Sequence, residues 1–228
     1  MWPHLLQKIY GEVNKHANTY GYLWVYVVRR NRTYMLYVIV SVALGFTVGV
    51  LLGILLSRVP KISVAILPLL SIFQTIPGLA FIGILFLITG MKPITVIIAL
   101  SVYVVFPVLK NTYAGILGVE EKYVEAAKRC GMTSFQTLIN VELPLASPSI
   151  IAGLRMAVIY TVSWTVLAAM IGLGGLGDFI YQGTTSNNNT LILLGAIPAA
   201  IIAIVLGIII DVLQKKLTPA GIGEVKDK

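Results

Sequence analysis

The chain has 228 residues, of which 57% are hydrophobic and 11% charged, whereas a soluble domain has about 25% charged residues. Lipid, not water, is therefore its expected main solvent. The net charge of +8 does not indicate nucleic-acid binding, because the Lys and Arg residues flank apolar runs instead of covering one solvated face.

The first apolar segment predicts a membrane crossing over residues 34–57, after an N-terminal tail at residues 1–33. Gly45, Gly49 and Gly53 repeat every four residues within it. This spacing puts them on one helix face, where they allow close contact with another helix. Glycine is also tolerated at any position of a membrane helix, so the stripe alone does not establish a contact.

The second apolar run, residues 62–91, is too long for one upright helix and contains Pro68 and Pro77. We expect one broken or steeply tilted crossing whose irregular part lies near residues 74–78. Irregular backbone at membrane depth is tolerated where it lines a cavity or a protein interface. A helical hairpin is the alternative.

Three more crossings complete a predicted all-α, polytopic membrane protein with about five transmembrane helices. They are expected at residues 93–109, 148–171 and 191–213, inside a transmembrane domain at residues 34–214 that precedes a basic tail at 215–228. Lys and Arg are absent from loop 172–190 but present in segment 118–142 and in the tail, which places the loop outside and the other two inside. Five crossings then place the N-terminus outside, against the cluster of Arg29, Arg30 and Arg32, which the same rule assigns to the cytoplasm.

The polar segment between the third and fourth crossings has the pattern of two short helices. Glu120 and Glu121 precede a helical stretch that Lys128 and Arg129 end, as the helix dipole favours. Gly131 then suits a helix C-terminus. Thr133 and Gln136 fit a capping box at the start of a second helix. A solvated charged linker is the alternative interpretation.

The same segment contains an extended motif. Glu125-Ala126-Ala127 is followed after three residues by Gly131, and after nine more by Val141-Glu142-Leu143-Pro144. This resembles the EAA motif of type I ABC importer permeases, whose coupling helices dock on ATPase subunits. The resemblance implies an ATPase-coupling loop at residues 118–144, in which that role falls to Glu125, Ala126, Ala127, Gly131, Leu143 and Pro144.

Further stretches narrow the resemblance to permeases for glycine betaine, carnitine, choline and proline betaine. They are residues 74–80, 106–113, 131–155 and 172–178, within an overall similarity from Ser41 to Lys216. The family implies a multi-pass protein of the prokaryotic cell membrane that pairs with a second permease copy, identical or different. It also implies ATPase subunits that bind ATP and Mg, and an extracytoplasmic substrate-binding protein.

Two rival functions stay open. A permease for another small solute, such as methionine, shares the five-crossing core and the EAA loop. An ATP-independent transporter or channel would bury charged residues along its ion path, and the central crossings contain almost none.

Other signals argue against chemistry on this chain. Gly172, Gly174 and Gly177 form a G-x-G-x-x-G pattern, but a membrane helix precedes it, not the strand that dinucleotide binding requires. The sequence has no G-x-x-x-x-G-K-[ST] loop, so ATP is expected on a partner subunit. His4 and His16 both lie in the tail. No catalytic residue, cofactor or metal site is expected.

Polar and aromatic residues inside the crossings are the candidates for a substrate path: Gln74, Thr75, Tyr103, Tyr160 and Trp164. Aromatic faces attract quaternary ammonium ions by cation–π interaction. Helix packing and interfacial belts explain the same aromatics. Arg155, near the start of the fourth crossing, is expected to reach the cytosolic interface with its long side chain.

Overall fold

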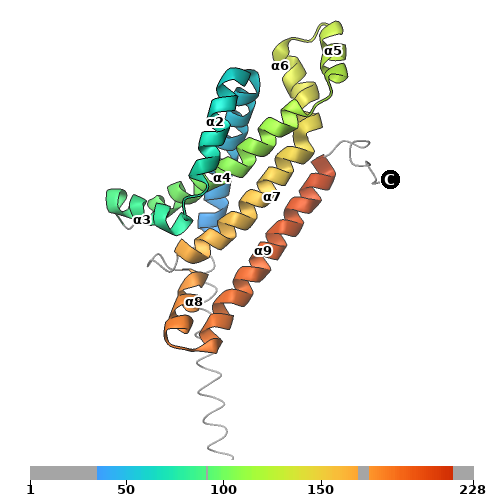
Figure 1. Ribbon diagram of the computed structural model, residues 1–228. Helices are drawn as coiled ribbons and strands as arrows, with labels where there is room; N and C mark the ends of the chain where they lie inside the picture. The colour runs from blue at the N-terminus through green and yellow to red at the C-terminus, as the bar shows by residue number, and fades with distance from the viewer. Residues whose placement is uncertain (1–34, 91, 169–174, 218–228) are drawn as a thin grey trace, which may run out of the picture.

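The structure is a computed structural model that describes residues 35–90, 92–168 and 175–217. These residues form helices joined by turns, and none of them lies in a strand. Helix Met35–Arg58 is followed by α2 (Pro60–Phe73), α3 (Gly78–Thr89), α4 (Pro93–Leu117), α5 (Glu121–Arg129), α6 (Ser134–Thr137), the π-helix η1 (Leu138–Glu142), α7 (Leu143–Ala168), α8 (Leu176–Thr185) and α9 (Asn189–Leu217) (Figure 1). The tail at 1–33, Gly172, Gly174 and residues 218–228 lie outside this description.

The glycine stripe of the first helix, Met35–Arg58, packs directly on α4. A Cβ atom added to each glycine would be too close to a side chain of α4. The distance would be 2.5 Å from Gly45 to Val104 Cβ, 2.8 Å from Gly49 to Val108 Cβ and 2.7 Å from Gly53 to Thr112 Cβ. We call these three contacts the glycine seam. Because both partners advance by four residues in the same direction, the two helices are parallel. Of the two interpretations that the sequence left open, the structure shows the close contact.

The segment between these two parallel helices forms one broken crossing. α2 ends at Phe73, a turn occupies residues 74–77, and α3 begins at Gly78. Since the first helix and α4 run in the same direction, α2 and α3 together must carry the chain back, so the hairpin alternative is wrong. Figure 1 shows α2 beside the bundle and α3 turning away from it.

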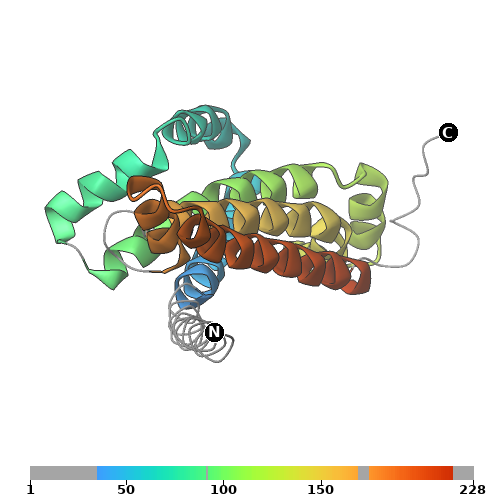
Figure 2. The same ribbon diagram turned by 90° about the horizontal axis from the view of Figure 1, so that it is seen from below.

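Helices α4 and α7 form the centre of the bundle and run antiparallel. A Cβ on Gly115 would lie 2.8 Å from Ser149 Cβ, whereas one on Gly153 would lie 2.7 Å from Asn111 Cβ. Both helices extend past the predicted crossings, since α4 continues to Leu117 and α7 begins at Leu143. Helical hydrogen bonding continues into water, so the first charged residue does not mark the end of a helix. Figure 2 shows the α2–α3 side of this pair opposite α9.

The predicted outer loop at 172–190 contains a helix. α8 packs against α9 so closely that a Cβ on Gly195 would lie 2.6 Å from the Leu176 carbonyl oxygen. The turn between them uses Asn188, whose Oδ1 accepts hydrogen bonds from the backbone N–H groups of Thr190 and Leu191 at 3.0 and 3.3 Å. With the 4 long apolar helices and the broken α2–α3 pair, the predicted all-α polytopic fold is confirmed.

Candidate coupling element and membrane break

The charged residues at the two ends of helix α5 lie where the sequence predicts them. Glu120 is its N-cap and Glu121 lies in its first turn, while Lys128 and Arg129 occupy its last turn. Each charge therefore faces the end of the helix dipole that stabilises it. Lys122 Nζ lies 2.5 Å from Glu120 Oε2, and this hydrogen bond raises the pKa of Lys122.

Gly131 ends α5 in the left-handed backbone region, with φ of 79°. The Gly131 N–H donates to the Lys128 carbonyl at 3.0 Å, and the Met132 N–H donates to the Ala127 carbonyl at 3.1 Å. These two bonds form a Schellman motif. A Cβ added to Gly131 would have no neighbour within 4 Å, so glycine is needed here for its backbone conformation and not for space.

The second predicted helix begins as expected but does not stay separate. Thr133 Oγ1 accepts from the Gln136 N–H at 3.3 Å, and Gln136 Oε1 accepts from the Thr133 N–H at 2.8 Å, which confirms the capping box. α6 then continues through η1 into α7 without a break in the helical backbone, over Ser134–Leu167. Pro144 cannot donate to the carbonyl four residues earlier, and the wider π-turn lies immediately before it.

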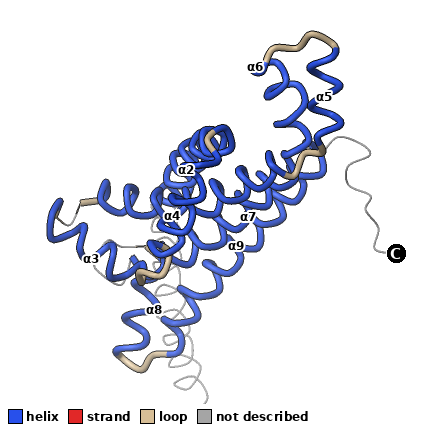
Figure 3. The backbone as a smooth tube through the Cα atoms, turned by 45° about the horizontal axis from the view of Figure 1, so that its top comes forward, coloured by secondary structure: helices blue, strands red, loops and turns tan. Residues whose placement is uncertain are grey.

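Helices α5 and α6 project beyond one end of the bundle (Figure 3) and combine charge with exposed apolar groups. Glu125, Ala126, Cys130 and Gly131 are exposed, whereas Ala127 is buried. Leu143 packs inside the bundle. Large hydrophobic side chains that the sequence analysis did not single out are also exposed: Tyr123, Met132, Phe135 (70%) and Ile139. Their only signal in the sequence is their place in an otherwise polar segment.

The turn between α2 and α3 is fastened by aromatic residues. The Tyr103 hydroxyl donates to the Ile76 carbonyl at 2.8 Å, which satisfies a backbone acceptor that no helix uses. Trp164 stacks on Tyr103 with ring centroids 5.4 Å apart. Phe81 meets Tyr103 edge-on at 5.6 Å. Gly78 lies against the Trp164 ring, where a Cβ would not fit.

Not every predicted path residue joins this aromatic cluster. Tyr103 and Trp164 are brought together, and Gln74 and Thr75 lie in the turn beside them. Thr75 Oγ1 donates to the Ile72 carbonyl at 2.7 Å. Tyr160 is 42% exposed, and among the described residues no ring contact joins it to the cluster. Phe81 was not predicted, and Gly78 was predicted only as part of the irregular stretch at residues 74–78.

Arg155 of α7 forms an ion pair with an acidic residue of α9. Its Nε lies 3.2 Å from Asp211 Oδ1 on α9, with side chains 50% and 41% exposed. A charge that faces apolar surroundings is less costly when an opposite charge lies beside it. The expected reach of Arg155 to the cytosolic interface stays a prediction. Its partner Asp211 was not predicted, because it is distant in the sequence.

Residues 45–220 match the family described as the inner membrane component of binding-protein-dependent transport systems. The chain is 40% identical over 187 residues to the carnitine transport permease protein OpuCB of Listeria monocytogenes, covering 82% of this chain and 86% of that protein. It is 41% identical over 189 residues to the choline transport system permease protein OpuBB of Bacillus subtilis strain 168, covering 83% and 87%.

The fold is similar to that of a solved transporter. A structure of the inward-facing MetNI methionine ABC transporter superposes with a TM-score of 0.77 at 21% identity, over 85% of this chain and 96% of that one. At that identity the likeness concerns the fold alone. From the family match and the relatives, the chain is a multi-pass membrane protein and belongs to the permeases of type I ABC importers.

Proposed function

We propose that this chain is the permease of an importer that carries quaternary ammonium osmoprotectants, such as glycine betaine, choline or carnitine. The observation that carries this proposal is the identity of about 40% with choline and carnitine permeases over more than four fifths of both chains. Energy comes from separate ATPase subunits that bind ATP and Mg. A binding protein outside the membrane delivers the solute.

The coupling loop at 118–144 is the part that we assign to the ATPase subunits. Its helices α5 and α6 project from the bundle. The loop exposes Phe135, Tyr123 and Met132, which suit a hydrophobic groove on a partner. Glu125 is half-exposed, with Arg129 Nη2 3.5 Å from its Oε2, so a partner cation can compete for it. The small residues Ala126 and Gly131 allow a partner surface to approach the backbone closely.

The substrate path that we propose passes the break between α2 and α3. Gln74 and Thr75 offer polar groups there, and Tyr160 and Trp164 offer aromatic faces to a quaternary ammonium ion. Tyr103 is 8% exposed, so its part is to hold the break in place. A second permease copy, identical or different, supplies the other half of the path.

Uptake into proteoliposomes tests this function. The permease is reconstituted with its ATPase and binding protein, and radiolabelled glycine betaine, choline, carnitine and methionine are compared. We expect ATP-dependent uptake of at least one quaternary ammonium solute and none of methionine. The matched control is an ATPase that binds but does not hydrolyse ATP. Uptake of methionine alone would overturn the substrate class, and uptake with the inactive ATPase would overturn the energy source.

A further inference from the structure

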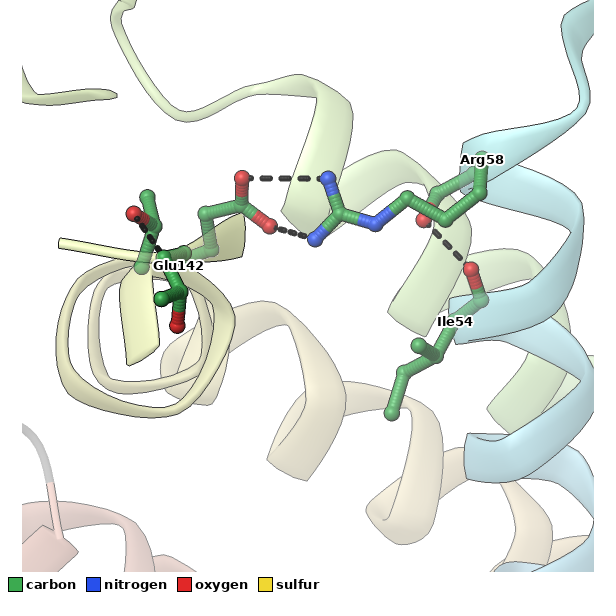
Figure 4. A network of polar contacts seen from close by, with 6 residues as sticks. Ile54, Arg58 and Glu142 are labelled. Atoms are coloured by element: carbon green, nitrogen blue, oxygen red, sulfur yellow. Dashed lines mark hydrogen bonds and ion pairs between the residues drawn. The ribbon is translucent and has the colours of Figure 1, made fainter. Parts of the chain in front are cut away.

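An ion pair connects the end of the coupling loop with the end of the first helix (Figure 4). Arg58 Nη1 donates to Glu142 Oε1 at 3.2 Å, and Nη2 donates to Oε2. Arg58 is the last residue of the first helix, and Glu142 is the last residue of η1. The guanidinium thus bridges both carboxylate oxygens, a geometry that fixes orientation as well as charge.

The Glu142 carboxylate depends on this partner. Its side chain is 6% exposed, whereas that of Arg58 is 44% exposed. A carboxylate withdrawn from water is costly unless it is paired and hydrogen-bonded. Loss of the arginine would therefore leave a buried carboxylate without its cation and destabilise the η1 turn that holds it.

The pair lies at the edge of a packed cluster where four elements meet. Ile54 of the first helix, one turn before Arg58, packs against the same buried cluster as Leu138, the first residue of η1, and Leu143, the residue after it. Those buried residues, Ile116 of α4 and Ala146 and Ile150 of α7, form the centre of the cluster. The ion pair and the apolar contacts therefore join the same elements.

The element that holds Glu142 is unusual. In η1 the Leu143 N–H donates to the Leu138 carbonyl, five residues back. Such π-turns are rare and frequently occur at functional sites. Here the π-turn is the joint between the projecting α6 and the bundle helix α7, so a shift of α5 and α6 relative to the bundle acts first on the residue that Arg58 holds.

Arg58 also lies just before the segment that leads to the turn between α2 and α3. Val59 follows it, and α2 begins at Pro60. α2 ends at the turn that Tyr103 fastens through Ile76. A change at the Glu142 end of the pair can therefore reach α2 without passing through α7.

We propose that Arg58 is a positioning residue that, through Glu142, fixes the first helix and α2 to the coupling loop. Displacement of α5 and α6 then moves the first helix, α2 and α7 as one body. This inference rests on the proposed function, because it assigns the displacement to the partner ATPase. The coupling of ATP hydrolysis to transport depends on this pair.

The test uses Arg58→Glu, Glu142→Arg and the double variant, with Lys61→Glu as the control. Lys61 is an exposed cation three residues after Arg58. The full importer is reconstituted, and the ratio of solute imported to ATP hydrolysed is measured. We expect each single variant to lower the ratio by roughly 2- to 30-fold while basal ATP hydrolysis continues. The double variant should recover most of the ratio, and the control should keep it.

Hydrogen exchange of the η1 amides in the purified permease needs no transport. Both single variants should exchange faster at residues 138–143, and the double variant should recover. If the parent importer does not transport these solutes, the proposed function is wrong. The exchange data still test whether the Arg58–Glu142 pair stabilises η1. If a charge reversal prevents folding, Arg58→Gln and Arg58→Lys replace it, with a larger loss expected for Gln. Folded single variants with the parent ratio and parent exchange rates would overturn the inference.

Discussion

Two parts of the bundle use glycine in opposite ways. On the seam between the first helix and α4, added Cβ atoms would come within 2.5–2.8 Å of Val104, Val108 or Thr112. On α3, a Cβ at Gly83 would have nothing within 4 Å, and Leu87 and Ile88 are 88% and 76% exposed. The seam therefore has no room for sliding, whereas α3 is attached along one face and open on the other.

This difference indicates which parts can change during transport. A close-packed seam transmits displacement because its side chains have no free volume. α3 is attached through Ile82, which is fully buried against α4 residues such as Val96 and Leu100, and through the turn that Tyr103 holds. A motion that opens a path therefore costs least where this turn and α3 move against the rigid pair.

The largest expected effect on the unfolding free energy comes from adding a methyl group to a glycine of the seam, compared with a glycine of α3. Gly45→Ala places a Cβ 2.5 Å from the Ser101 carbonyl oxygen, so we expect a loss of about 1–3 kcal/mol in unfolding free energy. Gly83→Ala should be neutral or stabilising by up to about 1 kcal/mol, because alanine is the better helix former. Thermal unfolding of the purified permease measures both. A loss at Gly83 equal to that at Gly45 would break the comparison.

Gly131 is a third case, because glycine is required there for its backbone conformation and not for space. Gly131→Val should cost about 1–2 kcal/mol locally, because a branched residue is strained at positive φ. The midpoint of bundle unfolding should barely change, while ATP hydrolysis stimulated by substrate and binding protein should fall. Gly131→Asn tolerates the left-handed region and should retain more of the stimulation. Equal activity of the Val variant and the parent would contradict this account.

A smaller effect is expected at the hydrogen bond by which Tyr103 holds the turn between α2 and α3. Tyr103→Phe keeps the ring against Trp164 and Phe81 but removes the donor to the Ile76 carbonyl. We expect a loss of about 1 kcal/mol in unfolding free energy and faster hydrogen exchange around residues 76–81. Tyr160→Phe, at an exposed ring outside the cluster, is the control and should behave like the parent. Identical exchange in both variants would show that Tyr103 does not hold the turn.

The smallest effect is expected at the ion pair between α7 and α9. Arg155 and Asp211 are about half exposed, so their pair should contribute no more than about 1 kcal/mol. Asp211→Asn should lower the unfolding midpoint by a few degrees at most, and the effect should shrink at high salt. A large, salt-independent loss would indicate that this pair is enclosed in the assembled transporter.

Local chemistry predicted the local structure well. The ends of α5, the capping box at Thr133 and the broken crossing near Pro77 all follow from short-range preferences of single residues. The spacing of Gly45, Gly49 and Gly53 allowed a close contact, but only the structure shows that α4 makes it. The pairs between distant segments, Arg58 with Glu142 and Arg155 with Asp211, could not be predicted, because one sequence does not say which helix faces meet. The merger of α6 with α7 was missed for another reason, since a capping box marks a start and says nothing about where a helix ends.

The assignment of residues 118–144 to the cytosolic, ATPase-facing side is the central claim, because the proposed coupling and the role of Arg58 both depend on it. Cys130 is the only cysteine of the chain, and it is exposed at the end of α5. A membrane-impermeant maleimide should not label it in intact cells. It should label inside-out vesicles stripped of ATPase, and more slowly once the ATPase is restored. Rapid labelling from outside intact cells would reverse the topology and contradict the account.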